Sequence, residues 1–455
     1  MTIYKNVLDM IGNTPMIEFS HLDTGPCTLY AKLELANPGA SIKDRIAMTM
    51  IEEAEKRGDI SPGDTLIEST AGNTGLGLAL VAQQKGYKLV LVIPDKMSPE
   101  KVFNCRAMGA EVILTRSDVA KGHPEYYQDY AKRLADENGW FYVNQFGNSD
   151  NPLAHERTTG PEILAELPDV DAIVLGVGSS GTITGLTKYL KEHAPHVEIV
   201  LADPEGSILA PYINTGEMIE AGSWLVEGIG EDFIPDICDL SQAKKAYSIP
   251  DAEAFETVRQ VLLQEGIQAG SSSGTLFAAA LRYCREQTEP KKVVTFACDT
   301  GNRYLSKVYN DFWMFDQGFS RRREFGDLRD LISRPQEDRS TVVVGPKDTL
   351  ATTHNRLRNH GFSQIPVVDG ETYLGVITEA DLISAVMRGG FSQQAETAMN
   401  PNFPTLEVTE PLGKLMSLLE IETCVAIVDN RENKTGFHGV ITRSDILNHL
   451  RKQHG

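Results

Sequence analysis

Short apolar segments alternate with helix-like segments from Thr65 to about residue 300, and this alternation is the strongest constraint on the fold. The run at 89–93, Leu-Val-Leu-Val-Ile, is apolar at every position, so both faces of the strand must be covered, as in a parallel sheet. Similar runs follow at 111–114, 172–175, 198–202 and 293–297. The pattern predicts an α/β protein, with helices packed on parallel sheets, through about residue 315.

The pattern changes beyond residue 315. Residues 316–338 lack a clean periodicity and are predicted to form a linker with some helix. An internal repeat follows, in which Gly375-Val-Ile-Thr-Glu-Ala-Asp-Leu is echoed by Gly439-Val-Ile-Thr-Arg-Ser-Asp-Ile. We therefore predict three parts, a domain at 1–315 with two subdomains, the linker, and a pseudo-symmetric pair at 339–455, with repeats at about 339–390 and 396–452.

Composition excludes several classes of function. The formal net charge of -20 argues against a protein surface that binds the phosphates of a nucleic acid. No apolar run reaches the length of about 18 residues needed to cross a membrane, and the N-terminus has no signal-peptide pattern. The six cysteines form no CxxC pair, so free thiols in a reducing compartment are expected rather than disulfides or a metal site. These features predict a cytoplasmic protein that acts on small molecules, without nucleic acid, membrane or metal.

The segment Pro38 to Arg45 delivers one lysine, Lys43, to the start of a predicted helix. Apolar residues recur after it at helical spacing, and Gly58 offers a stop. Taken alone, Lys43 is most simply an exposed and inert side chain, because a catalytic lysine needs burial or a cationic neighbour to lower its pKa. The function of Lys43 therefore depends on which other residues surround it in the folded chain.

Three glycine-rich turns follow predicted strands, at 69–75, 176–182 and 270–275. A turn of glycines and hydroxyl residues that leads into a helix leaves backbone N–H groups free to bind an anion. The second turn is suited to a phosphate and the first to a substrate carboxylate. Neither a Rossmann fingerprint with its acidic ribose partner nor a P-loop is present. Strand-to-helix turns are also rich in glycine for packing reasons alone.

Six motifs occur in the order found in one enzyme family: PGASIKDR, STAGNTGLGLA, GVGSSGTITG, VEGIG, EGIQAGSSSG and CDTGNRY. Residues 3–315 resemble the β-family (fold type II) of pyridoxal-phosphate enzymes. The nearest branch is the one that forms cystathionine, and the O-acetylserine sulfhydrylases are near relatives. The tail resembles a pair of CBS domains. The resemblance implies a catalytic core of two open twisted sheets with helices, followed by an α+β regulatory pair.

The resemblance also implies roles for individual residues. Lys43 would bind the cofactor, pyridoxal 5'-phosphate, covalently and serve as the catalytic base and acid. Asn73 would bond the ring hydroxyl, and Ser272 would face the pyridine nitrogen. A neutral hydroxyl cannot hold that nitrogen protonated, so the ring is a weaker electron sink, which favours prompt loss of a β leaving group. The phosphate cradle would consist of Gly178, Ser179, Ser180, Gly181 and Thr182.

Two further groups of residues match substrate positions of the family. The α-carboxylate site would consist of Thr70, Ala71, Gly72, Asn73, Thr74 and Gln145. Ala71 stands where many members have serine, so one hydrogen bond is absent or comes from the backbone. In the loop with Gly228, the carboxylate of Glu227 could engage the ammonium group of homocysteine, which sulfide lacks. The alternative is that Glu227 and Glu231 are solvated loop charges.

The implied reaction is a β-replacement that condenses L-serine with L-homocysteine to L-cystathionine and water, catalysed by a hydro-lyase. The enzymatic alternative is synthesis of cysteine from O-acetylserine and sulfide. A third alternative is a catalytically silent ligand sensor or scaffold. The catalytic core begins almost at Met1 and Cys-Pro-Trp is absent, so no haem is expected. A homodimer or higher homo-oligomer is expected by resemblance.

The CBS pair implies a regulatory ligand. Such pairs usually bind adenosyl compounds, with the aspartate of Thr-x-x-Asp on the ribose hydroxyls, and the matching residues are Thr378, Asp381, Thr442 and Asp445. The ligand would be S-adenosylmethionine or an adenine nucleotide. The alternative is that these residues are ordinary helix caps, because threonine and aspartate favour helix starts.

Overall fold

A computed structural model describes residues 3–70, 72–95, 97, 99–119, 121–431 and 434–454. The chain divides into two compact units, Met1–Tyr309 and Asn310–Gly455. Among the helices described, none is both long enough and apolar enough to cross a bilayer.

The larger sheet of the first unit has the strand order β1-β2-β10-β7-β8-β9. Only β1 runs antiparallel to its neighbour, and the remaining pairs are parallel. The strands are β1 (Met16–Glu18), β2 (Thr28–Lys32), β7 (Ala172–Leu175), β8 (Glu198–Pro204), β9 (Ala243–Ile249) and β10 (Lys292–Phe296).

The smaller sheet has the order β5-β4-β3-β6, with parallel pairing throughout. Six of the seven residues of β4 are buried, which confirms the prediction that this apolar strand is covered on both faces. The strands are β3 (Thr65–Ser69), β4 (Lys88–Pro94), β5 (Glu111–Thr115) and β6 (Phe141–Tyr142).

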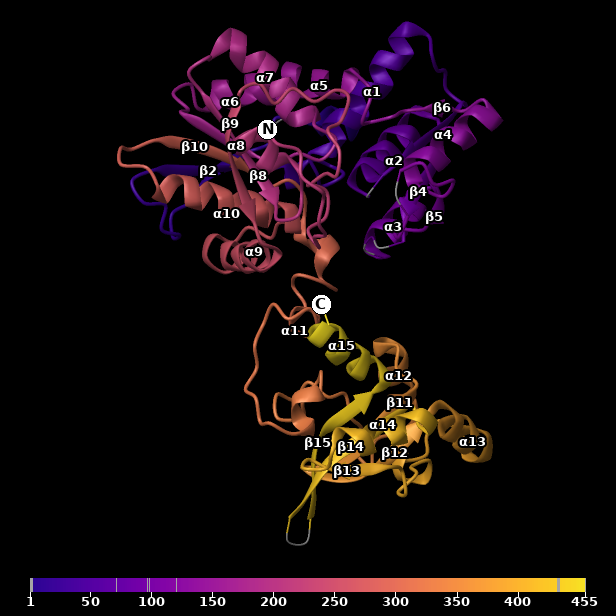
Figure 1. The fold of residues 1–455 in the computed structure, drawn as a ribbon. Helices are drawn as coiled ribbons and strands as arrows, with labels where there is room; N and C mark the ends of the chain where they lie inside the picture. Colours follow the sequence, from indigo (N-terminus) through magenta and orange to yellow (C-terminus); the bar gives the residue numbers. More distant parts are fainter. Residues whose placement is uncertain are drawn as a thin grey trace. The chain divides into compact units, whose positions relative to one another are not determined.

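Helices cover both sheets of the first unit, and Figure 1 shows α7 and α10 on opposite faces of the larger one. The prediction of an α/β protein is therefore confirmed. The helices are α1 (Lys43–Arg57), α2 (Asn73–Lys85), α3 (Pro99–Ala107), α4 (Tyr127–Asn138), α5 (Asp150–Ala154), α6 (Gly160–Glu166), α7 (Gly181–His193), α8 (Leu209–Thr215), α9 (Asp251–Glu265) and α10 (Ser271–Arg285), with a π-helical turn at His155–Thr159.

Four strands of this unit were not predicted: β1, β2, β6 and β9. The strand β9 lies at an edge of the larger sheet and exposes three of its seven residues, so its sequence lacks the continuous apolar run of a central strand. The strand β6 has only two residues, too few to show a period.

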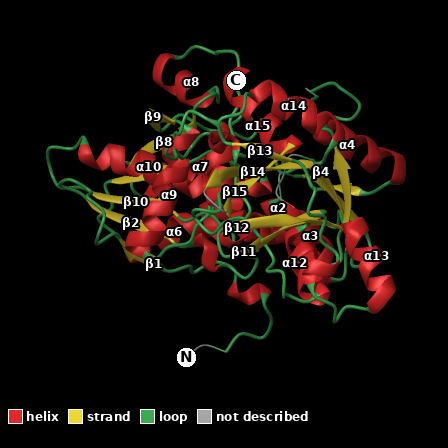
Figure 2. Ribbon diagram, turned by 90° about the horizontal axis from the view of Figure 1, so that it is seen from below, coloured by secondary structure: helices red, strands yellow, loops and turns green. Residues whose placement is uncertain are grey.

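The second unit contains a five-stranded sheet of order β11-β12-β15-β14-β13. Figure 2 shows the strands in this order, with α12 beside the first repeat and α14 beside the second. Leu328 and Ile332 pack in the core of this unit with Leu406, so part of the predicted linker is integral to it. The elements are α11 (Asp311–Asp316), α12 (Leu350–His360), β11 (Gln364–Asp369), β12 (Thr372–Thr378), α13 (Glu379–Gly389), β13 (Thr405–Glu407), α14 (Leu412–Ile421), β14 (Cys424–Arg431), β15 (Lys434–Thr442) and α15 (Arg443–His454).

Candidate active site

Lys43 is the first residue of α1, as predicted from the sequence. The helix buries the apolar face that carries Ile46 and Met50, and ends at Gly58 in a left-handed conformation. The turn before it is fixed by Ile42, whose N–H donates to the carbonyl of Cys298 at 2.8 Å. The Lys43 side chain opens onto a cavity but is enclosed by protein. Desolvation lowers its pKa, only partly opposed by Cys298 and Asp299.

The cavity has a volume of about 340 Å³ and collects residues from all three glycine-rich turns. It brings Lys43 together with every other residue predicted for the cofactor and the substrate, except Ala71, which lies outside the described residues. The members are Lys43, Thr70, Gly72, Asn73, Thr74, Gln145, Gly178, Ser179, Ser180, Gly181, Thr182, Glu227, Gly228 and Ser272.

The second turn forms a cradle between the end of β7 and the start of α7. At Gly178 a Cβ atom would lie 2.5 Å from the carbonyl oxygen of Gly228, so only glycine fits there. Ser180 adopts a left-handed conformation with φ of 65°, and its buried hydroxyl lies beside the Cys238 thiol without a nitrogen or oxygen partner among the described residues. The first N–H groups of a helix also have no intrahelical acceptor. An orphaned hydroxyl at a helix N-terminus fits a phosphate group.

Ser272 lies in the first turn of α10, where its buried side chain lines the same cavity. A neutral hydroxyl at this point can bond a ring nitrogen without forcing a proton onto it. Together with Lys43 and the cradle, Ser272 completes a set of residues that fits pyridoxal phosphate.

The first turn lies between β3 and α2 and is tied to Gln145. Thr74 donates to Gln145 Oε1 at 2.6 Å, and Gln145 Nε2 donates to the carbonyl of Ser69 at 3.0 Å. The N–H of Gly72 donates to Thr70 Oγ1 at 3.0 Å. These bonds hold the N-terminus of α2 open to the cavity, as an anion site requires.

Asn73 is bonded on both sides by residues that the sequence analysis did not assign. Its Nδ2 donates to Asp299 Oδ2 at 2.7 Å, and its Oδ1 accepts from Arg303 Nη1 at 2.8 Å. Both partners lie in the distal motif CDTGNRY, which carries the family resemblance. The presence of this motif could have pointed to Asp299 and Arg303 as residues of the site, but it did not indicate that they contact Asn73.

Glu227 is buried between two lysines, so the alternative of a solvated loop charge is wrong. One oxygen accepts from Lys101 Nζ at 2.8 Å and the other from Lys307 Nζ at 2.6 Å. Burial alone would raise the pKa of the carboxyl group, but the two ammonium groups lower it. Sequence reasoning missed both lysines, and all three side chains line the cavity.

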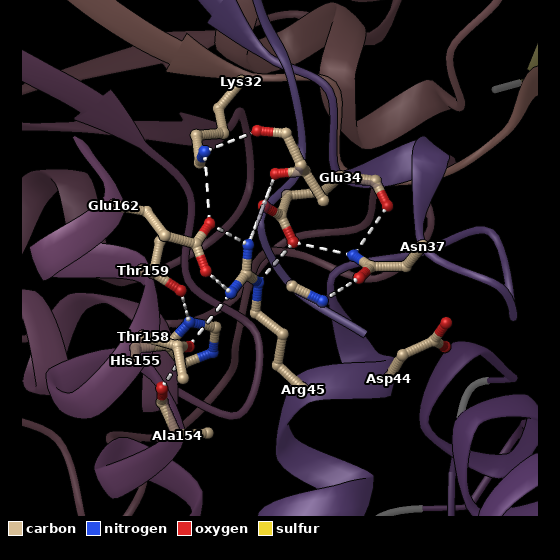
Figure 3. A network of polar contacts seen from close by, with 12 residues as sticks. Lys32, Glu34, Asn37, Asp44, Arg45, Ala154, His155, Thr158, Thr159 and Glu162 are labelled. Carbon is tan, nitrogen blue, oxygen red and sulfur yellow. Dashed lines mark hydrogen bonds and ion pairs between the residues drawn. The ribbon is translucent and has the colours of Figure 1, made fainter. Parts of the chain in front are cut away.

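A buried ionic network surrounds Arg45, two residues after Lys43 in the sequence (Figure 3). Arg45 forms one bidentate pair with Glu34 and a second with Glu162, at 2.7–2.8 Å. Burial would raise the pKa of Glu162, but its bonds with Arg45 lower it to about 2. Arg45 also donates to Thr158 in the π-helical turn, at 3.0 Å.

The same π-helical turn reaches the phosphate cradle through His155. This fully enclosed imidazole contacts Thr159 Oγ1 at 2.9 Å and Thr182 Oγ1 at 3.2 Å. Desolvation, followed by the charges of Arg45 and Lys43, holds the pKa of His155 well below its usual value. The neutral ring therefore connects the network of Figure 3 to the cradle.

The four residues predicted for a regulatory ligand lie at equivalent helix starts in the second unit. Asp381 Oδ2 accepts from the N–H and the hydroxyl of Thr378, which completes a capping box. Asp445 Oδ2 accepts the same two bonds from Thr442, and its other oxygen accepts from Ser333. The two repeats thus differ, because only the second aspartate is contacted by the preceding segment among the bonds described.

Comparison with protein families gives two matches. Residues 7–299 match the model described as pyridoxal-phosphate dependent enzyme, and residues 329–388 and 395–452 each match the CBS domain. Among the described residues, no group of His, Cys, Asp or Glu is arranged to hold a metal ion.

Curated relatives of the whole chain share one description. A cystathionine beta-synthase of Oryctolagus cuniculus is 38% identical over 98% of this chain and 84% of its own length. One of Saccharomyces cerevisiae is 39% identical over 83% of this chain and 80% of its own.

Solved structures resemble the first part of the chain. An O-acetylserine dependent cystathionine beta-synthase from Helicobacter pylori is 39% identical with a TM-score of 0.63, and the match covers 68% of this chain and 100% of that chain. A hydrogen sulfide-producing enzyme from Fusobacterium nucleatum is 39% identical with a TM-score of 0.62, over 67% of this chain and 100% of that one.

Proposed function

The chain belongs to the cystathionine β-synthase family of pyridoxal-phosphate enzymes, and on this premise we propose that it condenses L-serine with L-homocysteine to L-cystathionine and water. Its cofactor is pyridoxal 5'-phosphate. The observation that carries the proposal is the convergence of Lys43, the Gly178–Thr182 cradle and Ser272 on one cavity. No single one of these features would suffice, because each occurs in unrelated proteins.

Cavity residues from the three glycine-rich turns and from the start of α1 would hold the cofactor. Lys43 would hold it covalently, the Gly178–Thr182 cradle would bind its phosphate, Asn73 would bond the ring hydroxyl, and Ser272 would face the ring nitrogen. When bound, pyridoxal phosphate withdraws electrons from Cα of the attached amino acid, which acidifies the Cα proton and allows the β substituent to leave.

Lys43 moves the protons of the reaction. Its lowered pKa leaves a larger fraction of the released amine neutral near pH 7, so it can accept the Cα proton. The resulting ammonium then protonates the departing hydroxyl, which leaves as water. Lys43 thus serves in turn as covalent anchor, base and acid.

The first turn binds the α-carboxylate of serine. Thr70, Gly72, Asn73 and Thr74 present the N-terminus of α2 and hydroxyl groups to the anion. Gln145 is fixed by Thr74 and by the carbonyl of Ser69, so its remaining N–H can be held toward the substrate.

The thiol substrate enters beside Glu227, Gly228 and the two lysines. Within this cluster two ammonium groups bind one carboxylate, so the three side chains together carry a surplus of one positive charge. This surplus suits the carboxylate of homocysteine, while Glu227 suits its ammonium group. Sulfide carries neither group, so the cluster favours an amino-acid thiol.

The test offers the purified protein serine or O-acetylserine, each with homocysteine or sulfide, and identifies products by mass spectrometry. We expect serine with homocysteine to give cystathionine faster than any pairing gives cysteine.

The variant Lys307→Gln should raise KM for homocysteine by about 10-fold and leave KM for sulfide unchanged, as the loss of one charge-assisted hydrogen bond implies.

Faster formation of cysteine than of cystathionine would overturn the proposal in favour of the second candidate, an O-acetylserine sulfhydrylase. The O-acetylserine donor of that candidate is kept because one solved structure that resembles the first part of the chain is an O-acetylserine dependent cystathionine beta-synthase. A silent sensor is disfavoured by the complete set of Lys43, Asn73 and Ser272.

The second unit is proposed to bind an adenosyl ligand, S-adenosylmethionine or an adenine nucleotide, at Thr378 and Asp381 and at Thr442 and Asp445. The first repeat is the more accessible of the two, because Ser333 already occupies one oxygen of Asp445. The capping bonds use only Oδ2 of Asp381, which leaves Oδ1 for a ribose hydroxyl.

Asp381→Asn should weaken the ligand by about 10-fold, because a charged hydrogen-bond acceptor is lost. The measurement is isothermal titration of the full chain with S-adenosylmethionine and with ATP. Asp445→Asn is the matched variant and should change the affinity less. No heat with either ligand would show that these residues are only caps.

We also propose a homodimer or larger homo-oligomer in the cytoplasm. All six cysteines are unpaired, as is usual in a reducing compartment. Helices of the second unit expose large apolar side chains, among them Met387 and Ile421, which a partner copy could cover. Light scattering on the purified chain measures the assembly directly.

A further inference from the structure

The carboxylate of Asp299 is fully buried where three motifs of the first unit meet. Its backbone forms an antiparallel bridge with Ser41, two residues before Lys43. Its carbonyl accepts from the N–H of Gly270, at the entrance to the third glycine-rich turn, at 2.9 Å. Its side chain reaches Asn73 in the first turn. One residue thus contacts the segments that carry Lys43, Asn73 and Ser272.

The amide of Asn73 is held by two partners of opposite kind. Asp299 is a carboxylate and only accepts, so it takes an N–H of Asn73 at 2.7 Å. Arg303 is a guanidinium and only donates, so it binds the amide oxygen at 2.8 Å. If the amide were flipped, its oxygen would face the carboxylate oxygen of Asp299 and its nitrogen would face the guanidinium of Arg303. The orientation of Asn73 is therefore fixed by charge.

An amide nitrogen carries two N–H groups, and Asp299 uses one of them. The other belongs to a side chain that lines the cavity. We propose that Asp299 and Arg303 are positioning residues, which fix the Asn73 amide so that its remaining N–H donates to the ring hydroxyl of the cofactor. This inference rests on the proposed function, because it assumes the role of Asn73 stated there.

The surroundings of Asp299 leave its carboxylate little freedom. Tyr304 donates to Oδ2 at 2.7 Å, on the same oxygen that Asn73 uses. The other oxygen, Oδ1, is buried and has no partner among the described residues. A Cβ atom at position 270 would lie 2.0 Å from Oδ1, so Gly270 allows the carboxylate to sit there. Arg303 is anchored separately by the carbonyl of Gly39.

The test compares three variants of the full chain in the apo form: Asp299→Leu, Asp299→Asn and Asn73→Ala. Leucine has the same number and branching of side-chain heavy atoms as aspartate but no acceptor, whereas asparagine keeps an oxygen that can accept from Asn73. We expect Asp299→Leu to weaken binding of pyridoxal phosphate about 10-fold, as the loss of a hydrogen bond predicts, and to change the ratio of the absorbance bands of the bound cofactor. Asp299→Asn should keep most of the wild-type cofactor affinity and a band ratio close to that of the wild type.

A double-mutant cycle separates positioning from structure. In the Asn73→Ala background, Asp299→Leu should cause no further loss of cofactor affinity or change of spectrum, because Asp299 acts through Asn73. Equal losses in both backgrounds would overturn the proposal. If Asp299→Leu does not fold, Arg303→Gln serves in the same cycle, because it removes the second constraint on the amide.

These readouts do not depend on which product forms. A wild-type protein that binds pyridoxal phosphate but makes no cystathionine would refute the proposed function and leave the cycle interpretable. A working synthase whose Asp299→Leu variant keeps wild-type affinity and spectrum would refute only the role of Asp299.

Discussion

Replacing Lys43 by alanine is expected to abolish turnover, with a loss of at least about 10³-fold, because one side chain is anchor, base and acid. Burial also lowers the pKa of Lys43, which suits it to act as the base. The measurement is cystathionine formation, with the absorbance of the bound cofactor recorded on the same sample.

The matched control is Lys88→Ala, at an exposed position where β4 begins. It should keep full activity, and both variants should keep the wild-type circular dichroism spectrum. If Lys43→Ala still released product at more than a trace rate, another group would have to supply the proton transfers, and the proposed mechanism would be wrong.

The parts of the site that could be predicted from the sequence are those with a local signature. Lys43 at a helix start, and glycine-rich turns between strand and helix, follow from spacing within about ten residues. The order of the motifs then indicated the family, which the comparisons confirmed. Local patterns did not show that the three turns open onto one cavity, since this depends on sheet order.

The residues missed by sequence reasoning act over long separations. Asp299 reaches Asn73 across 226 positions, and Lys101 reaches Glu227 across 126. A lysine within a helix carries no sign that it will be buried against a carboxylate, and most lysines are exposed. Glu227 lines the cavity together with the other residues predicted for the substrate, but its two lysine partners could come only from the tertiary structure.

The role of the four residues predicted for a regulatory ligand could not be derived from the sequence for a different reason. Thr-x-x-Asp is both a helix cap and, in CBS domains, a ribose contact, and one sequence serves either purpose. The capping bonds are present in both repeats, and in each they use one oxygen of the aspartate. The inequality between the repeats arises from Ser333, more than 100 positions before Asp445, which no motif indicated.

The largest loss of stability is expected on replacing Arg45 by methionine. Arg45 joins the fully buried Glu34 and the partly buried Glu162 by two bidentate pairs (Figure 3). Methionine fills similar space but leaves the charge of Glu34 without its counterion inside the protein. Removing one partner of a buried pair costs about 3–5 kcal/mol, so the free energy of unfolding of the first unit should fall by that amount in urea denaturation.

The control lies on the same helix. Arg57, with 46% of its side chain exposed, pairs with the exposed Asp59 and the partly buried Asp150, so water can reach the guanidinium and Arg57→Met should cost less than Arg45→Met, about 1 kcal/mol. Because the chain has two units, the transition of each must be followed separately, and Arg45→Met should leave that of the second unit unchanged. Equal losses for the two variants would mean that Glu34 is relieved by protonation or by water. The network around Arg45 would then not hold rigidly the turn that carries Lys43.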